Sequence, residues 1–340
     1  MSAAQPRPDV LMPLRNLCNS VKCSRDRVRD GESNECSGAF SLSNFWETLS
    51  EAVKSTSQEA TKLSVMFSNA PSEEDCVKIS ESVQKSVLTL STVYFWLPAS
   101  QGVSLRKVVR DATAEVLDGL VHLLEAILSS PGESLSQEQL MSTGGVWAAC
   151  DQFDQLPKDN RSAVLSVLTA CAGLVKDALE EMEQALAEAQ DPFGAVLDDD
   201  DEDEGHQDTH WSEADRLLVT QCQGLMKASG ASLRKLCSAV RTNGSLETEE
   251  RISQLDALTD AARDISPSVD DLALSLYPPV DRSAVDLNVC KLVCVLKKVL
   301  EITRSSHVCA EADVSWVEFL SGAVEHNLQK ITSLLRDCGS

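Results

Sequence analysis

The residues of this chain best suited to hold a metal ion are His206, Asp208 and His210, which alternate beside a run of acidic residues. Imidazole nitrogens and carboxylate oxygens are common ligands of divalent metal ions. A metal site also needs its ligands in a fixed geometry, and a stretch of solvated carboxylates does not supply one. We therefore expect no metal at these residues and no cofactor elsewhere.

Two cysteines and two aspartates are a second set of candidates for chemistry. Cys290 and Cys294 are four residues apart on an expected helix, but a structural zinc site needs two more ligands and the sequence nominates none. Packing in a core is the expectation for both, and also for Cys76, Cys150, Cys171 and Cys222 on other apolar helix faces.

Asp270 and Asp271 are adjacent, so on a helix their carboxylates point in different directions. We expect them to favour the start of a short helix through its dipole.

Catalytic motifs are absent from the sequence. It contains no H-E-x-x-H, no P-loop, no G-x-G-x-x-G and no G-x-S-x-G, and its five histidines are scattered. His122 lies beside the apolar stripe of its expected helix, which predicts a half-buried histidine and not a base. We expect a protein without enzymatic activity.

The acidic run itself is a candidate for binding a partner. No Lys or Arg occurs from residue 177 to residue 208, so the run repels itself and is expected to form a solvated linker. A basic protein surface could be recruited by it. The run consists of Asp198, Asp199, Asp200, Asp201, Glu202, Asp203 and Glu204.

Composition limits the class of partner. The net charge is −23 over 340 residues, which argues against direct binding of nucleic acid, because phosphate recognition relies on Lys and Arg. Twelve cysteines without a C-x-x-C motif, and an N-terminus interrupted by Pro6, Pro8 and Pro13, predict reduced thiols in an intracellular protein. The longest apolar runs, 93–97 and 292–296, are far shorter than the ~20 residues that span a bilayer, so we expect no membrane partner.

Helical periodicity dominates the rest of the chain. Apolar residues make up 43% and aromatic residues 4%, which favours helices packed through Leu, Val, Ala and Ile. The fold class expected is all-α, with two up-and-down bundles of four to five long helices joined by the acidic linker. We expect a flexible N-terminal arm (1–40) with at most a short helix, an N-terminal bundle (41–191), the linker (192–210) and a C-terminal bundle (211–340). A segment near 135–156 is expected to be broken at Gly144 and Gly145.

Long and uncommon motifs then point to a family. In the second half, the stretch 265–279 is followed by Lys-Leu-Val-Cys-Val-Leu-Lys-Lys-Val-Leu-Glu-Ile-Thr at 291–303. In the first half, the stretches 102–110, 146–150 and 180–185 look like motifs of the same family. With these motifs the chain resembles the cyclin-D-binding protein family, also called Grap- and cyclin-D-interacting. The family-signature segment comprises Ser266, Pro267, Asp270, Asp271, Tyr277, Pro278 and Pro279.

That resemblance implies a helical regulator, found in cytoplasm and nucleus, that acts without catalysis. Its expected partners are D-type cyclins, helix-loop-helix transcription regulators and adaptor proteins. It is expected to limit phosphorylation of the retinoblastoma protein by cyclin-dependent kinases and so to slow the cell cycle. The bundles are expected to be similar to those of talin and vinculin, so a structural or scaffolding module is the alternative function.

Two features of the sequence qualify how partners could dock. Arg-x-Leu, which cyclins read on many ligands, occurs three times, but two copies lie in expected helices whose leucines are needed for a core. No three leucines follow at seven-residue spacing, and the heptad-like seam of the 282–307 helix is expected to fill its own bundle. We therefore favour docking on the surface over leucine-zipper pairing. The Arg-x-Leu copies begin at Arg15, Arg216 and Arg234.

Overall fold

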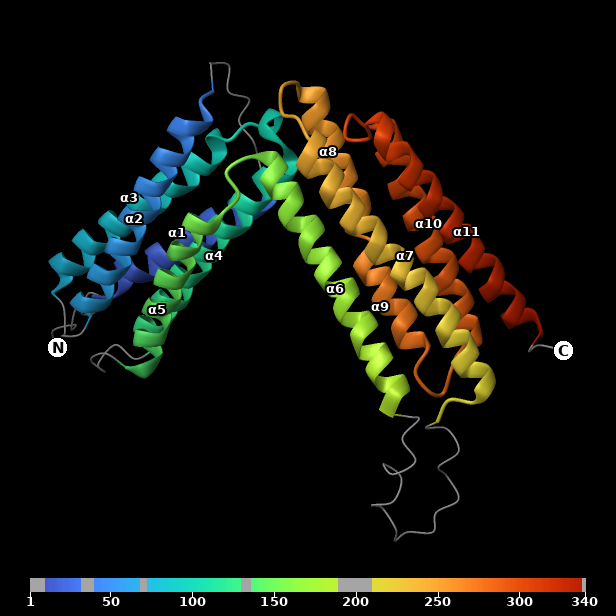
Figure 1. The fold of residues 1–340 in the computed structure, drawn as a ribbon. Helices are drawn as coiled ribbons and strands as arrows, with labels where there is room; N and C mark the ends of the chain where they lie inside the picture. The colour runs from blue at the N-terminus through green and yellow to red at the C-terminus, as the bar shows by residue number, and fades with distance from the viewer. Residues whose placement is uncertain (1–9, 32–39, 68–71, 130–135, 189–209, 338–340) are drawn as a thin grey trace, which may run out of the picture. The chain divides into compact units, whose positions relative to one another are not determined.

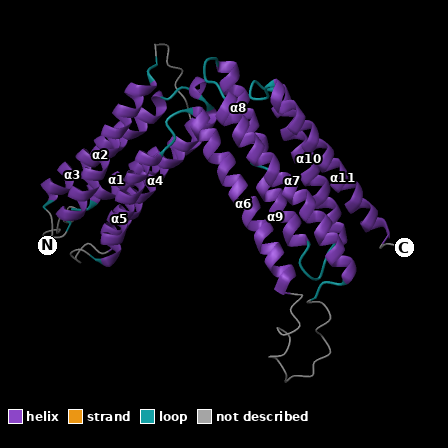
Figure 2. Ribbon diagram, in the orientation of Figure 1, coloured by secondary structure: helices purple, strands orange, loops and turns teal. Residues whose placement is uncertain are grey.

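The fold was examined in a computed structural model, which describes residues 10–31, 40–67, 72–129, 136–188 and 210–337. Apart from short 3-10 turns, the regular elements of these residues are α-helices, and no strand occurs among them (Figure 2). The expected all-α fold is confirmed. The chain divides into two compact units, Met1–Asp159 and Asn160–Ser340, here called unit 1 and unit 2.

Unit 1 is a closed ring of helices. Around the ring α1 packs on α4, α4 on α5, α5 on α2, α2 on α3, and α3 on α1 again (Figure 1). Leucine and valine side chains fill its centre, among them the fully buried Leu63, Leu90 and Leu120. The helices are α1 (Met12–Asp30), α2 (Leu42–Met66), α3 (Glu73–Trp96), α4 (Val103–Ser129) and α5 (Gln137–Asp151).

Unit 2 repeats this plan with one interrupted element. Here α6 packs on α7, α7 on α11, α11 on α10, and α10 on both α8 and α9, which in turn pack on α6. Two residues, Arg263 and Asp264, separate α8 from α9, so this pair occupies one place in the ring. The helices are α6 (Asn160–Glu188), α7 (Glu213–Asn243), α8 (Glu249–Ala262), α9 (Ile265–Ser275), α10 (Arg282–Ser305) and α11 (Val314–Asp337).

Serine caps begin several helices where the sequence indicated a start. The Ser72 hydroxyl accepts from the Asp75 backbone N–H at 3.2 Å, ahead of an acidic first turn that suits the helix dipole. Ser212 and Asp215 cap each other's backbone N–H groups in a capping box at the start of α7. Asn243 ends α7, directly before Gly244.

The division between the bundles differs from the one we expected. We placed residues 160–190 in the first bundle because the acidic run offered the more visible boundary. In the structure α6 packs against α7, α8 and α9, and its side chains Val164, Leu168 and Met182 belong to the core of unit 2. The chain therefore passes from unit 1 to unit 2 between residues 159 and 160. The acidic run falls between α6 and α7, two neighbouring helices of one bundle.

The N-terminal segment also differs from the flexible arm expected over 1–40. Residues 12–30 form α1, which packs on α3 and α4 and buries Leu14, Leu17 and Val21. Its basic residues are spaced to pair with α4: Lys22 with Glu125 at 2.7 Å, and Arg25 with Asp118 at 3.2 Å. Those carboxylates are about 100 residues away, so the sequence alone did not reveal the pairing.

Residues 137–151 form one helix, α5, where we expected an interruption at Gly144 and Gly145. Glycine costs only about 1 kcal/mol relative to alanine inside a helix, which tertiary contacts can outweigh. The buried residues Thr143 and Val146 flank the two glycines and supply such contacts. The expected interruption is wrong.

Among the described helices, α6 is the one long and apolar enough to cross a membrane by length and composition, with a mean hydropathy of 1.5 over its most apolar window. A helix packed in a bundle passes the same test, and α6 packs in unit 2.

Candidate partner-binding surfaces

The family-signature segment forms α9 and the turn that leads into α10. Pro267 lies in the first turn of α9, where its missing N–H costs no hydrogen bond. Ser266 is buried, and its side chain hydrogen-bonds with Cys171 of α6. Tyr277 packs on Trp211, with ring centroids 6.0 Å apart, and the peptide bond between Pro278 and Pro279 is cis. Part of the signature thus holds α9 in its bundle.

The turn after α9 is fixed to the start of α7. The indole N–H of Trp211 donates to the backbone carbonyl of Leu276 at 2.6 Å. Trp211 is buried, so this bond satisfies a carbonyl at the end of α9 that has no partner within the helix. Trp211 precedes the cap of α7, and the same residue therefore anchors two helix ends.

Asp270 and Asp271 do not start the helix as we expected, because α9 begins at Ile265. Asp271 instead forms an ion pair with Lys291 of α10 at 2.7 Å, and its backbone carbonyl accepts from the Asn288 side chain at 2.9 Å. Asp270 is exposed, and its pKa is raised by partial desolvation and by the like charges of Asp271 and Glu181. The two neighbours point apart, in agreement with the expectation that they do not form a catalytic pair.

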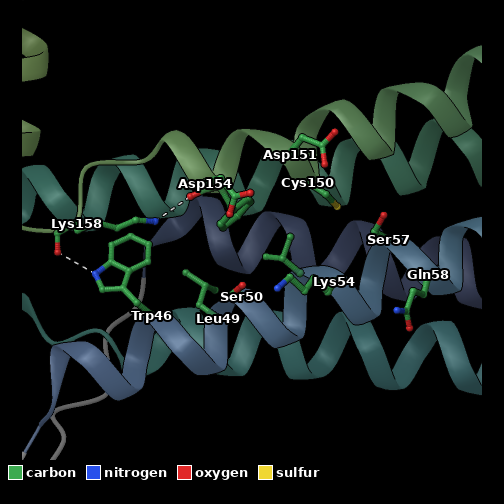
Figure 3. Close-up of a pocket in the computed structure, with 12 residues that line it drawn as sticks. Trp46, Leu49, Ser50, Lys54, Ser57, Gln58, Cys150, Asp151, Asp154 and Lys158 are labelled. Atoms are coloured by element: carbon green, nitrogen blue, oxygen red, sulfur yellow. Dashed lines mark hydrogen bonds between the residues drawn. The ribbon is translucent and has the colours of Figure 1, made fainter.

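In unit 1 a groove of about 300 Å³ runs between α2 and the end of α5 (Figure 3). We call it the α2–α5 groove. Its floor includes the buried side chains Leu49, Val53 and Phe153. At one end the Lys158 ammonium lies 4.2 Å from the centroid of the Trp46 ring, and the Trp46 N–H donates to the Lys158 carbonyl at 2.8 Å. The groove therefore has an apolar floor and a rigid cationic end.

Charged side chains of both signs line the same groove. Lys54 of α2 lines one side, and Asp151 and Asp154 line the other, with all three exposed. Figure 3 shows Lys54 on α2 and the two aspartates on the opposite wall. Such an arrangement suits a protein segment that carries an apolar side chain and charges, because a mixed rim can pair with either sign.

A second groove in unit 1 lies between α2 and α3 and is mostly apolar. It includes Thr48, Leu88 and Trp96, and the last two are 50% and 44% exposed. Exposed apolar side chains that lie together mark places where a protein binds a partner. We did not identify this groove from the sequence, although all its lining residues except Thr48 belong to α3.

Most cysteines of the described residues are either buried or exposed, and Cys309 is intermediate. Burial raises the pKa of the Cys150 and Cys222 thiols to about 12, which keeps them protonated and unreactive. Burial of Cys76, Cys150, Cys171 and Cys222 confirms the expectation for those four. Cys290 and Cys294 are exposed on the outer face of α10, so core packing was wrong for them.

The remaining candidates for chemistry are not brought together. His122 is exposed, not half-buried, and no group of three or more metal-ligating side chains forms among the described residues. His210 is exposed. His206, Asp208 and the acidic run from Asp198 to Glu204 lie outside the described residues.

The structure supports surface docking over the two alternatives weighed from the sequence. In each Arg-x-Leu copy the leucine is buried in its bundle: Leu17, Leu218 and Leu236 are at most 3% exposed. The seam of α10, which includes Val285, Leu292 and Leu296, is fully buried. Neither feature can reach a partner unless a bundle opens.

Comparison with known proteins gives the family. Models of the Grap2 and cyclin-D-interacting family match residues 48–188 (N-terminal) and residues 197–301 (C-terminal). The chain is 75% identical to a cyclin-D1-binding protein 1 homolog of Danio rerio, over 99% of both chains. It is 50% identical to the Xenopus laevis homolog (95% of this chain, 98% of the relative) and 40% identical to cyclin-D1-binding protein 1 of Homo sapiens (95% and 93%).

These matches define a class of helical binding proteins, and the chain belongs to the Grap2 and cyclin-D-interacting family. The boundary between the two family models, after residue 188, differs from the division of the structure at residues 159 and 160. The family models separate near the acidic run, as our sequence-based division did, whereas the packing of α6 places it with unit 2.

Proposed function

We propose that this protein binds a D-type cyclin and thereby restrains entry into the cell cycle. The observation that carries the proposal is the match along 99% of the chain to a relative named for binding cyclin D1. The exposed grooves of unit 1 supply places where a folded partner could dock.

The regulatory consequence follows from the type of partner. A protein that binds a D-type cyclin can compete with the cyclin-dependent kinase or with its substrate, so we propose that phosphorylation of the retinoblastoma protein falls. We propose helix-loop-helix transcription regulators and adaptor proteins as further partners, and action in both cytoplasm and nucleus. Binding without catalysis is the proposed mode of action.

Co-purification with a D-type cyclin tests the proposal. The intact chain is compared with a variant whose residues 198–204 are replaced by Gly and Ser. We expect the intact chain to retain the cyclin and to lower phosphorylation of the retinoblastoma protein in a kinase assay. Loss of binding in the variant would assign recruitment to the acidic run, and equal binding would assign it to the bundles. No retention by either form would refute cyclin binding.

A further inference from the structure

Three neighbouring helices of unit 2 present leucines to solvent on one face. Leu174 of α6 is 52% exposed, Leu274 of α9 is 71% exposed and Leu287 of α10 is 69% exposed. We call this surface the α9 face and define it by these three leucines together with Glu181 and Asp270. Such exposure leaves the apolar area of the leucine side chains in contact with water. A bound partner would bury that area, which favours binding.

Contacts between the helices place these residues along the surface. Cys171 of α6 hydrogen-bonds with Ser266 at the start of α9, so Leu174 lies beside the first turns of α9. Glu181 of α6 acts electrostatically on both Asp270 and Tyr277, so it lies alongside the part of α9 that carries Leu274. Leu174 precedes Glu181 by seven residues, about two turns on the same side of α6. The α6 side of the face is thereby joined to α9.

The α10 side is placed by the pair of Asp271 and Lys291 at 2.7 Å. Leu274 follows Asp271 by three residues and Leu287 precedes Lys291 by four. Both spacings put the leucine on the same helix face as its charged neighbour. α9 and α10 run in opposite directions and are joined by a short turn. Leu274 and Leu287 therefore both lie between the Asp271–Lys291 pair and that turn.

Charge distinguishes this face from an ordinary apolar patch. Lys291 is engaged by Asp271, while Glu181 and Asp270 repel each other across the α6–α9 boundary. The like charges of Asp271 and Glu181 face Asp270, and among the described residues neither Asp270 nor Glu181 forms an ion pair. From Ser162 to Val175 the α6 sequence carries no charged residue. The face thus combines an uncharged apolar surface with carboxylates that lack a counter-charge.

We propose that the α9 face binds a basic amphipathic helix of a partner protein, whose apolar side covers the leucines and whose Lys or Arg residues pair with Glu181 and Asp270. The inference rests on the proposed function as a binding protein, and it identifies the kind of partner that one surface accepts. Charge complementarity selects this occupant, since an acidic segment would add to the repulsion. The family-signature segment contributes Asp270 and the helix that carries Leu274.

The test uses the full chain and a fluorescently labelled synthetic helix of Leu and Lys, arranged so that all leucines share one side. Two double variants change the face at exposed positions: L274S with L287S, and E181K with D270K. Matched controls are Phe319→Ser, which is 73% exposed on α11, and Glu51→Lys, exposed on α2. Circular dichroism checks that every variant is folded.

We expect each double variant to raise the Kd for the peptide at least about tenfold and each control to leave it unchanged. A peptide with Glu in place of Lys, or with its leucines spread around the helix, should bind at least as weakly to the parent protein. Equal affinity of the double variants and the parent would overturn the proposal. Sedimentation of the parent with phosphatidylcholine vesicles, lost in L274S with L287S, would assign the face to lipid and also overturn it.

Binding of a D-type cyclin is measured in parallel with the same variants. Peptide binding that depends on the face, without any cyclin binding, would refute the proposed function and leave the α9 face established. Cyclin binding without peptide binding would refute the α9 face alone.

Discussion

The guanidinium carbon of Arg106 lies 5.2 Å from the ring centroid of Tyr94, and both side chains are buried in unit 1. Arg106 also donates to the backbone carbonyl of Leu97, which follows α3, and to that of Gly31, which follows α1, the latter at 3.1 Å. One side chain of α4 therefore satisfies carbonyls at the ends of two other helices, a buried one at Leu97 and a partly buried one at Gly31.

Substituting Arg106 should destabilise unit 1 more than substituting an arginine at its surface. We expect R106M to lower the free energy of unfolding by about 2–3 kcal/mol, because buried carbonyls lose a charged donor. Arg110 of the same helix pairs with its neighbour Asp111 and is half-buried, so R110M should change stability by about 0.5 kcal/mol or less. Urea denaturation followed by circular dichroism measures both. Equal losses would contradict the anchoring role of Arg106.

Fragments of the chain test where the units divide. We expect residues 160–340 to unfold cooperatively on heating, because they contain every helix of unit 2. Residues 192–340 lack α6 and with it Val164, Leu168, Val175 and Met182 of the core, so this fragment should lose its cooperative transition. Thermal melts followed by circular dichroism distinguish the two. Comparable melts would show that α6 is not part of the second bundle.

His307 makes unit 2 sensitive to mild acid. Its Nε2 accepts from the Ser245 backbone N–H at 3.1 Å, and its Nδ1 lies 2.8 Å from the Gln254 side-chain oxygen, which together select the neutral ring. Burial and the charge of Arg251 lower its pKa below the ordinary value. The unfolded state then binds more protons than the folded state, so stability falls as pH drops below about 6.5.

The variant H307Q should flatten this pH dependence. Chemical denaturation at pH 7.5 and pH 5.5 gives the difference in unfolding free energy for the parent, H307Q and H326Q. His326 is exposed on α11 and serves as the control. The parent and H326Q should lose stability between these pH values to a similar extent, and H307Q should lose less. A loss in H307Q as large as in the parent would contradict the neutral, hydrogen-bonded histidine.

Thiol alkylation separates the exposed cysteines from the buried ones. Cys294 should react with iodoacetamide at pH 8 within minutes, because it is exposed on α10. Cys290 is also exposed but should react more slowly, because partial desolvation and the charges of Asp286 and Cys294 raise its pKa. Cys150 and Cys222 should be protected until the protein unfolds, because burial keeps them in the unreactive thiol form. Mass spectrometry of tryptic peptides assigns the labelled sites. Early labelling of Cys222 would contradict the packing of unit 2.

Much of the fold was predictable because it depends on local sequence patterns, namely apolar periodicity and helix caps. The apolar stripe of α2, the Ser72 cap of α3 and the end of α7 at Asn243 each depend on residues that are close together in the sequence. The roles of α1 and α6 were missed because they depend on distant partners. Arg25 pairs with Asp118, and Leu168 packs into the core of unit 2, only when the helices come together.

The candidate surfaces were less predictable for the same physical reason. The signature segment was identified from its sequence, but its division into anchoring residues such as Ser266 and exposed ones such as Asp270 needed the bundle. Cys290 lies one residue after the buried Val289 and shares the outer side of α10 with the exposed Leu287 and Cys294, so it faces solvent. The α2–α5 groove arises between helices and leaves no mark in either helix alone.

The most direct test of cyclin binding is isothermal titration of the purified full-length chain with a purified D-type cyclin. Saturable binding at one cyclin per chain is the predicted result, and adding the cyclin-dependent kinase in advance should weaken it if the two compete. Absence of heat and of any complex by size-exclusion chromatography, with both proteins folded, would contradict cyclin binding by this protein.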